Sequence, residues 1–450
     1  MSKPYDLIVI GSGTAAQVAI ARVHARGWRI AVIDHRPFGG TCALRGCDPK
    51  KMLVSGEEAV DAAHRMHSHG ISGALRIEWP ALMAFKQSFT DPIPARQAKH
   101  YADLGVDAFQ GLARFTAPDR IAVNECVLVG RNILIATGAS PVPLGIAGED
   151  LVSTSDDFLE AKSLPRRIVL IGGGYIAAEF SHLAARAGSQ VTILQRGTRL
   201  LPPFDGDVVG WLMPSFDALG ITVHTGVTAD SIKLITNGLT VTATSPGGTQ
   251  IAVTAEMVVH AAGRAPDLAA LDLAAGDVAV DEGRLKLTPG LQSVSNPRVY
   301  AAGDAARSGP PLTPVSSHDA RVVTANMLDD ANARPDYNGV PSVAFTVPPI
   351  AAVGLSEAEA RAKERHFKIN AASVPNWFTA RRLNEAIYGY KVLVEKDSDL
   401  ILGAHLVGPG ADEVINLFAL AIRNGLTAKA LRNTMFAYPT AASDIGYMLD

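Results

Sequence analysis

The order of apolar and polar residues follows the same plan in two distant segments of the chain. Residues 7–34 and 168–196 each hold a run rich in β-branched residues, a glycine cluster, an alanine-rich stretch and a second apolar run. Short apolar runs bounded by glycine are typical of buried parallel strands, and alanine favours the helix between them. The pattern predicts two βαβ units, and therefore an α/β protein with two Rossmann-like dinucleotide-binding domains.

Both glycine clusters fit the dinucleotide-binding pattern G-x-G-x-x-A, as GSGTAA at 11–16 and GGGYIA at 172–177. A pyrophosphate must approach the N–H groups and positive dipole of a helix N-terminus, and a side chain at either of the first two glycines would block it. Two tight turns that only pack helix on strand are the alternative, but two copies in one context favour cofactor binding. The candidate residues are Gly11, Gly13, Ala16, Gly172, Gly174, Tyr175 and Ile176.

The residues that end the two units differ in charge. Asp34 ends the first unit, where a carboxylate accepts hydrogen bonds from ribose hydroxyls and repels a 2′-phosphate, as suits FAD. Gln195 ends the second and is followed by Arg196 and Arg199. An arginine in place of a carboxylate favours a 2′-phosphate, so we predict NADPH at this site, with NADH as the alternative. The other interpretation of the arginines is a solvated face.

Two later glycine turns, IATGA at 135–139 and YAAGD at 300–304, close further strands. Asp304 is placed either to bind the hydroxyls of a ribityl chain or to close its own loop as an Asx turn. The run LTPV at 312–315 begins a predicted helix whose N-terminus is a further candidate to face a cofactor. The candidate residues of these turns and of the AAGRAPD run at 261–267 are Thr137, Gly138, Gly263, Arg264, Gly303, Asp304 and Thr313.

The chain of 450 residues has room for about three domains. From about residue 340 the pattern changes to strands followed by helices, which predicts a C-terminal α+β domain. We expect an FAD-binding domain in two parts, 1–142 and 265–335, an NAD(P)-binding domain at 143–264, and the C-terminal domain at 336–450.

Composition and charge exclude several classes of protein. Lys and Arg number 41 against 44 Asp and Glu, and the net charge of −3 provides no attraction to nucleic acid or an anionic membrane. No apolar run reaches the roughly 18 residues of a membrane span, and residues 1–10 resemble a strand rather than a signal peptide. Three cysteines are too few to staple a secreted fold, so we expect a cytoplasmic protein. Cys126, in a predicted strand, is interpreted as a core or incidental thiol.

The other two cysteines lie close together in the run GGTCALRGCDPKK. Four residues separate Cys42 from Cys47, which does not fit a zinc-binding C-x-x-C, and there is no second pair, so we expect no metal site. A dithiol/disulfide couple is the better interpretation. Pro49 suits the first turn of a helix with Asp48 as its N-cap. Cys47 would then lie at the helix N-terminus, where the dipole stabilises a thiolate.

The run GGTCALRGCDPKK resembles the redox-active segment of the flavin-dependent pyridine nucleotide-disulfide oxidoreductases. This is the family of glutathione reductase, dihydrolipoamide dehydrogenase and mercuric reductase. The runs GSGTAA, GGGYIAAE, AAGRAPD, AAGDA, LTPV and FTVPPIAAVG are similar to the family's and in its order, so the resemblance spans essentially the whole chain. It implies FAD and NAD(P) domains of Rossmann type and a C-terminal α+β dimerisation domain, in a homodimer whose sites are shared between subunits.

The resemblance also implies an activity, which is NADPH-dependent and FAD-dependent reduction of a small disulfide or related acceptor. Hydride would pass from NADPH to flavin N5, and the flavin would reduce a Cys42–Cys47 disulfide. Cys47 is implied to be the charge-transfer thiolate and Cys42 the thiol that attacks the substrate. The other implied positions are Lys50 or Lys51 paired with Glu179 beside the flavin, Gly40 and Thr41 at the cofactor, Tyr175 as a gate over the flavin, and Arg264 at the nicotinamide nucleotide. The alternative for the lysines and for Glu179 is an exposed helix surface.

The C-terminal segment FAYPTAAS, residues 436–443, departs from the family. Tyr438 stands where disulfide reductases carry a histidine that donates a proton across the dimer, and Ser443 stands where they carry its glutamate partner. A tyrosine hydroxyl can donate a proton to a thiolate, but it does not cycle near neutral pH as imidazole does. Tyr438 is therefore the candidate proton donor, in an altered proton-transfer chemistry.

Other differences leave the acceptor open. Mercuric reductases carry a similar tyrosine but also a C-terminal vicinal cysteine pair that this sequence lacks, and glutathione-specific members carry an arginine where Ala21 stands. Asp48 places a carboxylate beside Cys47, where it opposes the thiolate by like-charge repulsion. The alternatives are a mercuric-ion or quinone reductase on the same scaffold, or a flavin redox sensor without turnover.

Overall fold

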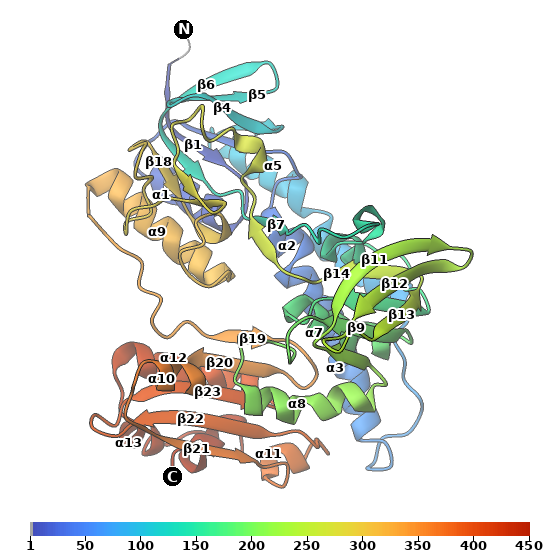
Figure 1. The fold of residues 1–450 in the computed structure, drawn as a ribbon. Coiled ribbons are helices and arrows are strands. Elements are labelled where there is room, and N and C mark those ends of the chain that lie inside the picture. The colour runs from blue at the N-terminus through green and yellow to red at the C-terminus, as the bar shows by residue number, and fades with distance from the viewer. Residues whose placement is uncertain (1–2) are drawn as a thin grey trace. The chain divides into compact units, whose positions relative to one another are not determined.

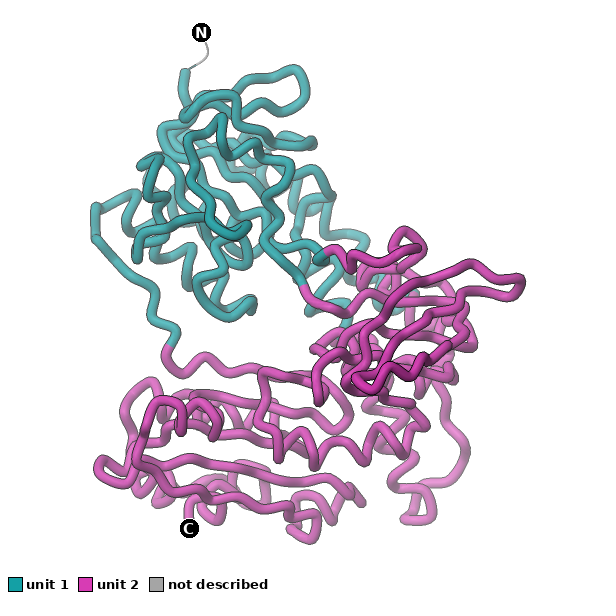
Figure 2. Tube along the Cα trace, in the orientation of Figure 1, with its two compact units in different colours: residues 1–50, 84–142, 264–337 teal, residues 51–83, 143–263, 338–450 magenta. Residues whose placement is uncertain are grey.

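The computed structural model describes residues 3–450, and the chain divides into two compact units (Figures 1 and 2). Unit 1 comprises Met1–Lys50, Ala84–Val142 and Arg264–Tyr337. Unit 2 comprises Lys51–Met83, Pro143–Gly263 and Asn338–Asp450. Each unit is therefore assembled from three separate segments of the chain.

Unit 1 is built on a seven-stranded sheet in the order β3-β2-β1-β6-β5-β4, with β18 also paired to β6. The parallel part of the sheet consists of β3, β2, β1, β6 and β18. Strands β4 and β5 form an antiparallel hairpin that pairs with the first half of β6. The strands are β1 (Tyr5–Ile10), β2 (Ile30–Asp34), β3 (Asp107–Gln110), β4 (Ala113–Ala117), β5 (Arg120–Val123), β6 (Cys126–Ile135) and β18 (Val299–Ala301).

Alternate residues of β1 pack on opposite faces of this sheet. Leu7 and Val9 belong to an apolar cluster with helices α1, α5 and α9, whereas Ile8 and Ile10 belong to a cluster with the β4–β5 hairpin. Burial of each such side chain is worth about 1.5–3 kcal/mol. Both faces are covered, which explains why β1 is a continuous apolar run. The helices are α1 (Thr14–His24), α2 (Gly40–Arg45), α5 (Ile93–Asp103) and α9 (Thr313–Asp329), with two short helices η2 (Ala269–Leu271) and η3 (Gly303–Ala305).

Two short two-stranded sheets complete unit 1. They are β7 (Ala139–Pro141) with β15 (Arg264–Pro266), and β16 (Val280–Asp281) with β17 (Arg284–Leu285). Two further helices, α3 (Cys47–Arg65) and α4 (Trp79–Thr90), each run from a segment of one unit into a segment of the other.

Unit 2 contains a parallel sheet in the order β10-β9-β8-β14 and a three-stranded antiparallel sheet, β11-β12-β13. The second predicted βαβ unit is β8, α7 and β9. Ile168 and Leu170 of β8 pack with α7 and α8, while Val169 and Ile171 face the three-stranded sheet. The elements are β8 (Arg167–Ile171), β9 (Gln190–Gln195), β10 (Thr222–Thr225), β11 (Thr228–Ile235), β12 (Gly238–Thr244), β13 (Gln250–Ala255), β14 (Met257–His260), η1 (Glu149–Leu151), α6 (Ser155–Leu159), α7 (Tyr175–Arg186) and α8 (Gly206–Ala218).

The C-terminal part of unit 2 is a five-stranded antiparallel sheet in the order β19-β20-β23-β22-β21. Val414, Ile415 and Phe418 of the long helix α12 are buried against it. The elements are β19 (Ser342–Ala344), β20 (Ile350–Gly354), β21 (Phe367–Ser373), β22 (Gly389–Glu395), β23 (Ile401–Val407), α10 (Glu357–Ala362), α11 (Phe378–Arg381), α12 (Ala411–Asn424), α13 (Ala428–Arg432), η4 (Ala441–Asp444) and α14 (Ile445–Met448).

An ionic cluster around the buried side chain of Lys391 joins this C-terminal sheet to the parallel sheet region of unit 2. The ammonium of Lys391 in β22 lies 3.2 Å from Asp205, 2.8 Å from Asp207 and 2.5 Å from Glu357. A buried cation needs such partners because desolvation is costly. Residues 51–83, which the sequence groups with the first domain, also pack in unit 2, where Leu53, Trp79 and Met83 share the apolar cluster of α7 and α8.

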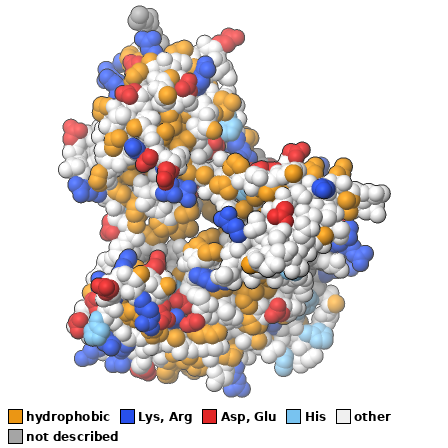
Figure 3. All heavy atoms as spheres, in the orientation of Figure 1, with side chains coloured by type: hydrophobic (Ala, Val, Ile, Leu, Met, Phe, Trp, Pro, Cys, Tyr) orange, Lys and Arg blue, Asp and Glu red, His pale blue; other side chains and the backbone are white. Residues whose placement is uncertain are grey.

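The structure confirms the predicted α/β class, with two Rossmann-like regions and a C-terminal α+β region. None of the helices within residues 3–450 combines the length and the apolar character that crossing a bilayer requires. On the face shown in Figure 3, basic and acidic side chains are interspersed over both units, in keeping with the net charge of −3.

Candidate active site

The two paired cysteines lie on consecutive helices of unit 1. Cys42 is in α2, and Cys47 is the first residue of α3, so Cys47 does occupy a helix N-terminus. Asp48 lies inside the first turn of α3 and not at the N-cap, because the helix begins earlier than Pro49 indicates. Cys126 begins β6 and is exposed, so its interpretation as a core thiol is wrong.

Thr313, the first residue of α9, joins the two thiols. Its hydroxyl oxygen lies 3.1 Å from Sγ of Cys42 and 3.4 Å from Sγ of Cys47. The two thiols also hydrogen-bond each other. The sequence predicted Thr313 as a cofactor-binding residue, and the structure adds a contact with both sulfur atoms that the sequence pattern did not indicate.

These contacts make the two thiols unequal. The hydrogen bond from Cys42 lowers the pKa of Cys47 to about 6, with help from Thr313 and the cation of Lys50, while burial and the Asp48 carboxylate oppose the shift. The same hydrogen bond, together with burial, raises the pKa of Cys42, and the Cys47 and Asp48 charges raise it further. The thiolate of the reduced pair therefore resides on Cys47.

The pH dependence of Cys47 reactivity tests this asymmetry. Because its folded-state pKa is lowered to about 6, the thiolate fraction should rise as the pH rises through 6 and be complete near pH 8. Replacing Thr313 by Val removes one hydrogen bond to the thiolate and should raise this pKa by about one unit. The measurement is the rate of Cys47 alkylation by iodoacetamide against pH in a Cys126→Ser background. An unchanged midpoint in Thr313→Val would contradict the role of the hydroxyl.

The first glycine turn lies directly beside the dithiol segment. Gly40 begins α2 with φ +77°, and a Cβ atom there would lie 2.3 Å from Cα of Gly13. Gly11 has φ +107°, and a Cβ atom there would lie 2.2 Å from the carbonyl oxygen of Ala136. Only glycine permits these approaches, of which the first brings the N-terminus of α1 next to α2 and the second brings the turn next to the end of β6. Ala16 is buried in α1, and Thr41 is exposed in α2.

Polar groups around this turn fit a bound dinucleotide. The hydroxyl of Thr137 is buried and has no hydrogen-bond partner among residues 3–450. An unsatisfied buried hydroxyl costs about 1–3 kcal/mol, so a ligand group is its natural partner. Asp34 accepts hydrogen bonds from the amide of Ser12 at 2.9 Å, its hydroxyl at 2.6 Å, and the amide of Arg36 at 2.9 Å. Ser12, which the sequence pattern did not single out, therefore orients the carboxylate predicted to contact the ribose.

The turn at Gly303 and Asp304 is held by a residue that the sequence analysis missed. Asp319 in α9 is fully buried and accepts from the amide of Gly303 at 3.0 Å and from the hydroxyl of Tyr337 at 2.8 Å. Asp304 makes no hydrogen bond within the described chain, so Asp319, and not an Asx turn of Asp304, closes the loop. Burial raises the pKa of Asp304, and the Arg264 cation opposes that shift. Asp304 is left available for a cofactor hydroxyl.

Three candidate residues, Gly138, Gly263 and Arg264, lie in or next to the short strands β7 and β15. β15 pairs antiparallel with β7, and the guanidinium of Arg264 donates to the carbonyl of Ala139. Gly138 directly precedes β7, and its carbonyl accepts a hydrogen bond from the amide of Asp267 at 3.0 Å. Gly263, the last residue of a unit 2 segment, immediately precedes Arg264 in the chain.

The second glycine turn, with Gly172 and Gly174, precedes α7 in unit 2. Arg199 is not available there, because its guanidinium donates to the carbonyls of Leu201 at 2.9 Å and Pro202 at 2.8 Å. Arg196 is exposed and forms no ion pair with any carboxylate that the structure describes. Of the two arginines, Arg196 is therefore the candidate for a 2′-phosphate.

Helix α7 presents a buried polar face to the segment after β19. Glu179 is 6% exposed, and its carboxylate accepts from the amide of Phe345 at 2.8 Å, so the alternative of a surface position is wrong. His182 accepts from the amide of Val347 at 3.2 Å, and Arg186 donates to the carbonyl of Val347 at 3.1 Å. Burial lowers the pKa of His182, in keeping with a neutral ring that accepts.

The two lysines after Cys47 have different surroundings. Lys50 is buried, and its charge helps to lower the pKa of Cys47. Lys51 forms an ion pair with Glu58 at 2.6 Å, and its ammonium lies 4.6 Å from the ring centre of Phe345. The pairing of either lysine with Glu179 stays a prediction. Tyr175 packs edge-on against Phe204 with ring centres 5.4 Å apart, and Ile176 follows it in α7.

Tyr438 lies in the loop before η4 and is 79% exposed. Its hydroxyl makes no hydrogen bond to residues 3–450. Ser443 donates to the carbonyl of Thr440 at 2.6 Å, so Ser443 closes its own turn and does not orient Tyr438. Met435 in the same loop is 98% exposed. The side chain of Tyr438 is therefore accessible to solvent and to other molecules.

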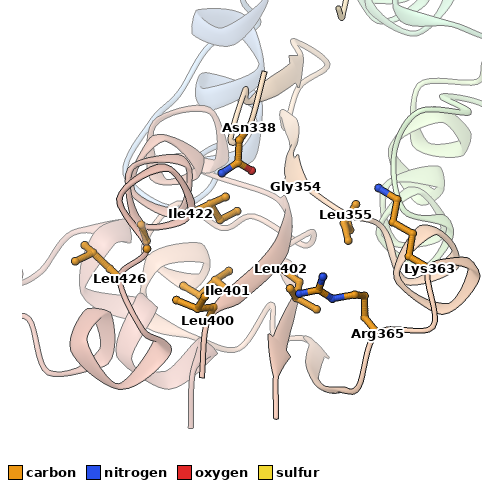
Figure 4. A pocket seen from close by; sticks show the side chains of 12 residues that line it. Asn338, Gly354, Leu355, Lys363, Arg365, Leu400, Ile401, Leu402, Ile422 and Leu426 are labelled. Atoms are coloured by element: carbon orange, nitrogen blue, oxygen red, sulfur yellow. The ribbon is translucent and has the colours of Figure 1, made fainter. Parts of the chain in front are cut away.

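A cavity of about 350 Å³ lies elsewhere in unit 2 (Figure 4). Apolar side chains such as Leu355, Leu400 and Leu426 line it together with Lys363 and Arg365, and none of the predicted site residues does. Within residues 3–450 no group of three or more His, Cys, Asp or Glu side chains has the arrangement of a metal site.

A dithiol with one stabilised thiolate and two dinucleotide-binding turns define an oxidoreductase with two dinucleotide cofactors. The family model for pyridine nucleotide-disulphide oxidoreductases matches residues 5–320, and the model for their dimerisation domain matches residues 340–448. The chain belongs to the pyridine nucleotide-disulphide oxidoreductase family. It is an enzyme of a family that uses FAD and NAD(P)H.

Named relatives differ in their acceptors. A glutathione reductase of Burkholderia cepacia is 32% identical over 442 residues, which are 98% of this chain and 97% of the relative. A mercuric reductase of Staphylococcus aureus is 32% identical over 450 residues, which are 98% of this chain and 81% of the relative. The HOCl-induced flavoprotein disulfide reductase RclA from Escherichia coli, solved as a Cu(II) complex, has a TM-score of 0.88 and 26% identity, with 100% of this chain and 99% of that chain covered.

Proposed function

We propose that this protein is an NADPH-dependent, FAD-containing reductase of a small disulfide or a related thiol-reactive acceptor. The observation that carries the proposal is the unequal dithiol, in which Thr313 contacts both sulfur atoms and Cys47 holds the thiolate. Exposed Arg196 beside the second glycine turn supports NADPH over NADH. When bound, FAD supplies the transfer of a hydride from NADPH and of two electrons to the Cys42–Cys47 disulfide.

The protein's own side chains carry the remaining steps. Cys42 gives up its proton and attacks one sulfur atom of R–S–S–R, which forms a Cys42–S–S–R mixed disulfide and releases one RS⁻. The Cys47 thiolate then attacks the sulfur of Cys42, which re-forms the Cys42–Cys47 disulfide and releases the second RS⁻. The proton that Cys42 released and one proton taken up from solvent convert the products into two RSH. The stabilised thiolate is thus on the residue that closes the cycle.

The proton donor in this proposal is Tyr438 of a partner subunit. The C-terminal region matches a dimerisation domain, and the loop of Tyr438 exposes its hydroxyl and Met435. A homodimer in which this loop completes the partner's dithiol site would provide the donor that each RS⁻ needs.

A Tyr438→Phe variant should lower kcat for disulfide reduction by about 10- to 100-fold, because only the proton donor is lost. Reduction of the enzyme by NADPH should keep its rate, since that step precedes the acceptor. Stopped-flow measurement of the two half-reactions separates these effects. Tyr447→Phe, which changes another exposed tyrosine of the same unit, is the matched control. Equal losses in both variants would contradict a specific role for Tyr438.

A metal ion or a quinone is the second candidate acceptor. Tyr438 in the position of the family histidine favours it, and one structure of the similar RclA protein is a Cu(II) complex. The deciding experiment is anaerobic NADPH titration of the FAD-loaded protein, followed by a panel of glutathione disulfide, lipoamide, cystine, Hg(II), Cu(II) and a quinone. Rapid turnover of a disulfide supports the first proposal. Quinone turnover that survives Cys42→Ser would support the second.

A further inference from the structure

Asp48 places a negative charge at the thiol that meets the acceptor. It lies in the first turn of α3, is exposed, and its Oδ1 is 3.9 Å from Sγ of Cys42. Cys42 itself is half-buried. An acceptor atom bonded to the sulfur atom of Cys42 therefore lies within a few ångströms of the Asp48 carboxylate.

Two negative charges act on Cys42. Both Cys47 and Asp48 raise the pKa of Cys42 through their negative charges. The nearby cation, Lys50, is buried and acts on Cys47. A carboxylate about 6 Å from a charged group on an acceptor changes the reaction rate by about threefold in bulk water and by about a hundredfold at the effective dielectric constant near a protein surface. The rate rises for a cationic group and falls for an anionic one, and we expect an effect of about tenfold or more for an exposed carboxylate.

We propose that Asp48 is a specificity residue that favours acceptors carrying positive charge beside the reacting atom and disfavours anionic ones. This inference rests on the proposed function and names the charge class of its acceptor. Asp48 acts through its charge and exchanges no proton or electron in the reaction. Cationic disulfides are preferred substrates, and disulfides with carboxylates near the sulfur atoms are poor ones.

The test uses two methanethiosulfonates of the same core, one with a trimethylammonium group and one with a sulfonate. The Cys42 thiolate attacks the thiosulfonate sulfur, which forms a mixed disulfide and releases methanesulfinate, so no added oxidant is needed. The full-length holoprotein with Cys47→Ser and Cys126→Ser keeps Cys42 as its single thiol. The readout is the ratio of the two rate constants, divided by the same ratio for free 2-mercaptoethanol. Both reagents meet the same thiolate fraction, so a changed pKa of Cys42 cancels.

The normalised ratio should be about 10 or more with Asp48 present and fall to about 1 in Asp48→Asn. In the protein that keeps Asp48, the normalised ratio should also fall as the salt concentration is raised from about 0.01 to 0.5 M, because ions screen an exposed charge. Asp103→Asn, at the far end of α5, removes an exposed carboxylate of the same unit and should leave the ratio unchanged. A ratio that is the same in Asp48→Asn, or insensitive to salt, overturns the inference.

Steady-state turnover then separates this inference from the proposed function. The neutral hydroxyethyl disulfide reports whether the enzyme reduces disulfides at all. Cystamine and dithiodipropionate report charge preference, with cystamine expected to have about a 10-fold or greater advantage in kcat/KM that Asp48→Asn removes. A salt-dependent thiosulfonate ratio without turnover of any disulfide would reject the proposed function and keep the charge selection. Turnover of all three disulfides at equal kcat/KM would reject the charge selection and keep the proposed function.

Discussion

A Cys42→Ser variant is expected to lose disulfide turnover by a factor of about 1000 or more. Cys42 is the nucleophile in the proposed mechanism, and a serine hydroxyl beside the Asp48 carboxylate has no means of forming the mixed disulfide. Anaerobic reduction by NADPH should remain, because it does not need an external acceptor. Steady-state kinetics with the best disulfide from the panel, together with a single-turnover reduction by NADPH, provides the measurement.

The matched control for this prediction is Cys126→Ser, which changes an exposed thiol of the same unit that has no predicted role. It should keep disulfide turnover within about twofold, since an isolated surface substitution has small effects. Turnover that persists in Cys42→Ser would show that the acceptor is reduced without the dithiol.

Replacement of Arg196 by Gln should raise the KM for NADPH by about 10- to 100-fold and leave the KM for NADH nearly unchanged. The reason is that an arginine–phosphate contact is a charge-assisted hydrogen bond worth about 1.5–3 kcal/mol, and only NADPH carries the 2′-phosphate. Arg199 does not replace it, because its guanidinium already serves the carbonyls of Leu201 and Pro202. Steady-state kinetics with both nucleotides at one acceptor concentration measures the change.

Arg167→Gln is the control for this charge change. Arg167 starts β8, at the opposite end of the strand from the glycine turn, and its guanidinium pairs with Glu256 at 2.7 Å. Its loss should leave both KM values unchanged. If Arg196→Gln raised the KM for NADPH and for NADH by the same factor, Arg196 would support the turn and would not bind the 2′-phosphate.

The sequence predicted the local elements of the fold well because their signals are contiguous. The two βαβ units and the helix position of Cys47 each depend on fewer than about 30 neighbouring residues, and glycine, alanine and β-branched residues act locally on the backbone. The N-cap prediction for Asp48 was wrong by two residues, since α3 begins at Cys47, and helix ends are commonly misplaced by this much. Cys126 was interpreted as a core or incidental thiol, and the core alternative was wrong. An apolar strand pattern does not reveal which end of the strand is exposed.

The partners of the site residues came only from the tertiary structure. Thr313 contacts Cys42 across 271 positions of sequence, Asp319 closes the Gly303 turn, and Glu179 accepts from Phe345 across 166 positions. No local propensity encodes such contacts, since they form only when separate segments pack together. The sequence named Arg196 as the candidate for the 2′-phosphate with Arg199 nearby, and the structure adds that the guanidinium of Arg199 donates to backbone carbonyls.

The sequence by itself determined the family, the two cofactor turns and the dithiol, because each is a contiguous motif whose chemistry depends on residue type and spacing. The sequence also indicated a thiolate at Cys47, and the tertiary structure decided which hydrogen bonds and charges act on the two sulfur atoms. Those properties depend on hydrogen bonds and on distances of a few ångströms among Cys42, Cys47, Asp48 and Thr313. Electrostatic energies change steeply over such distances, so the sequence names the groups and only packing sets their effect.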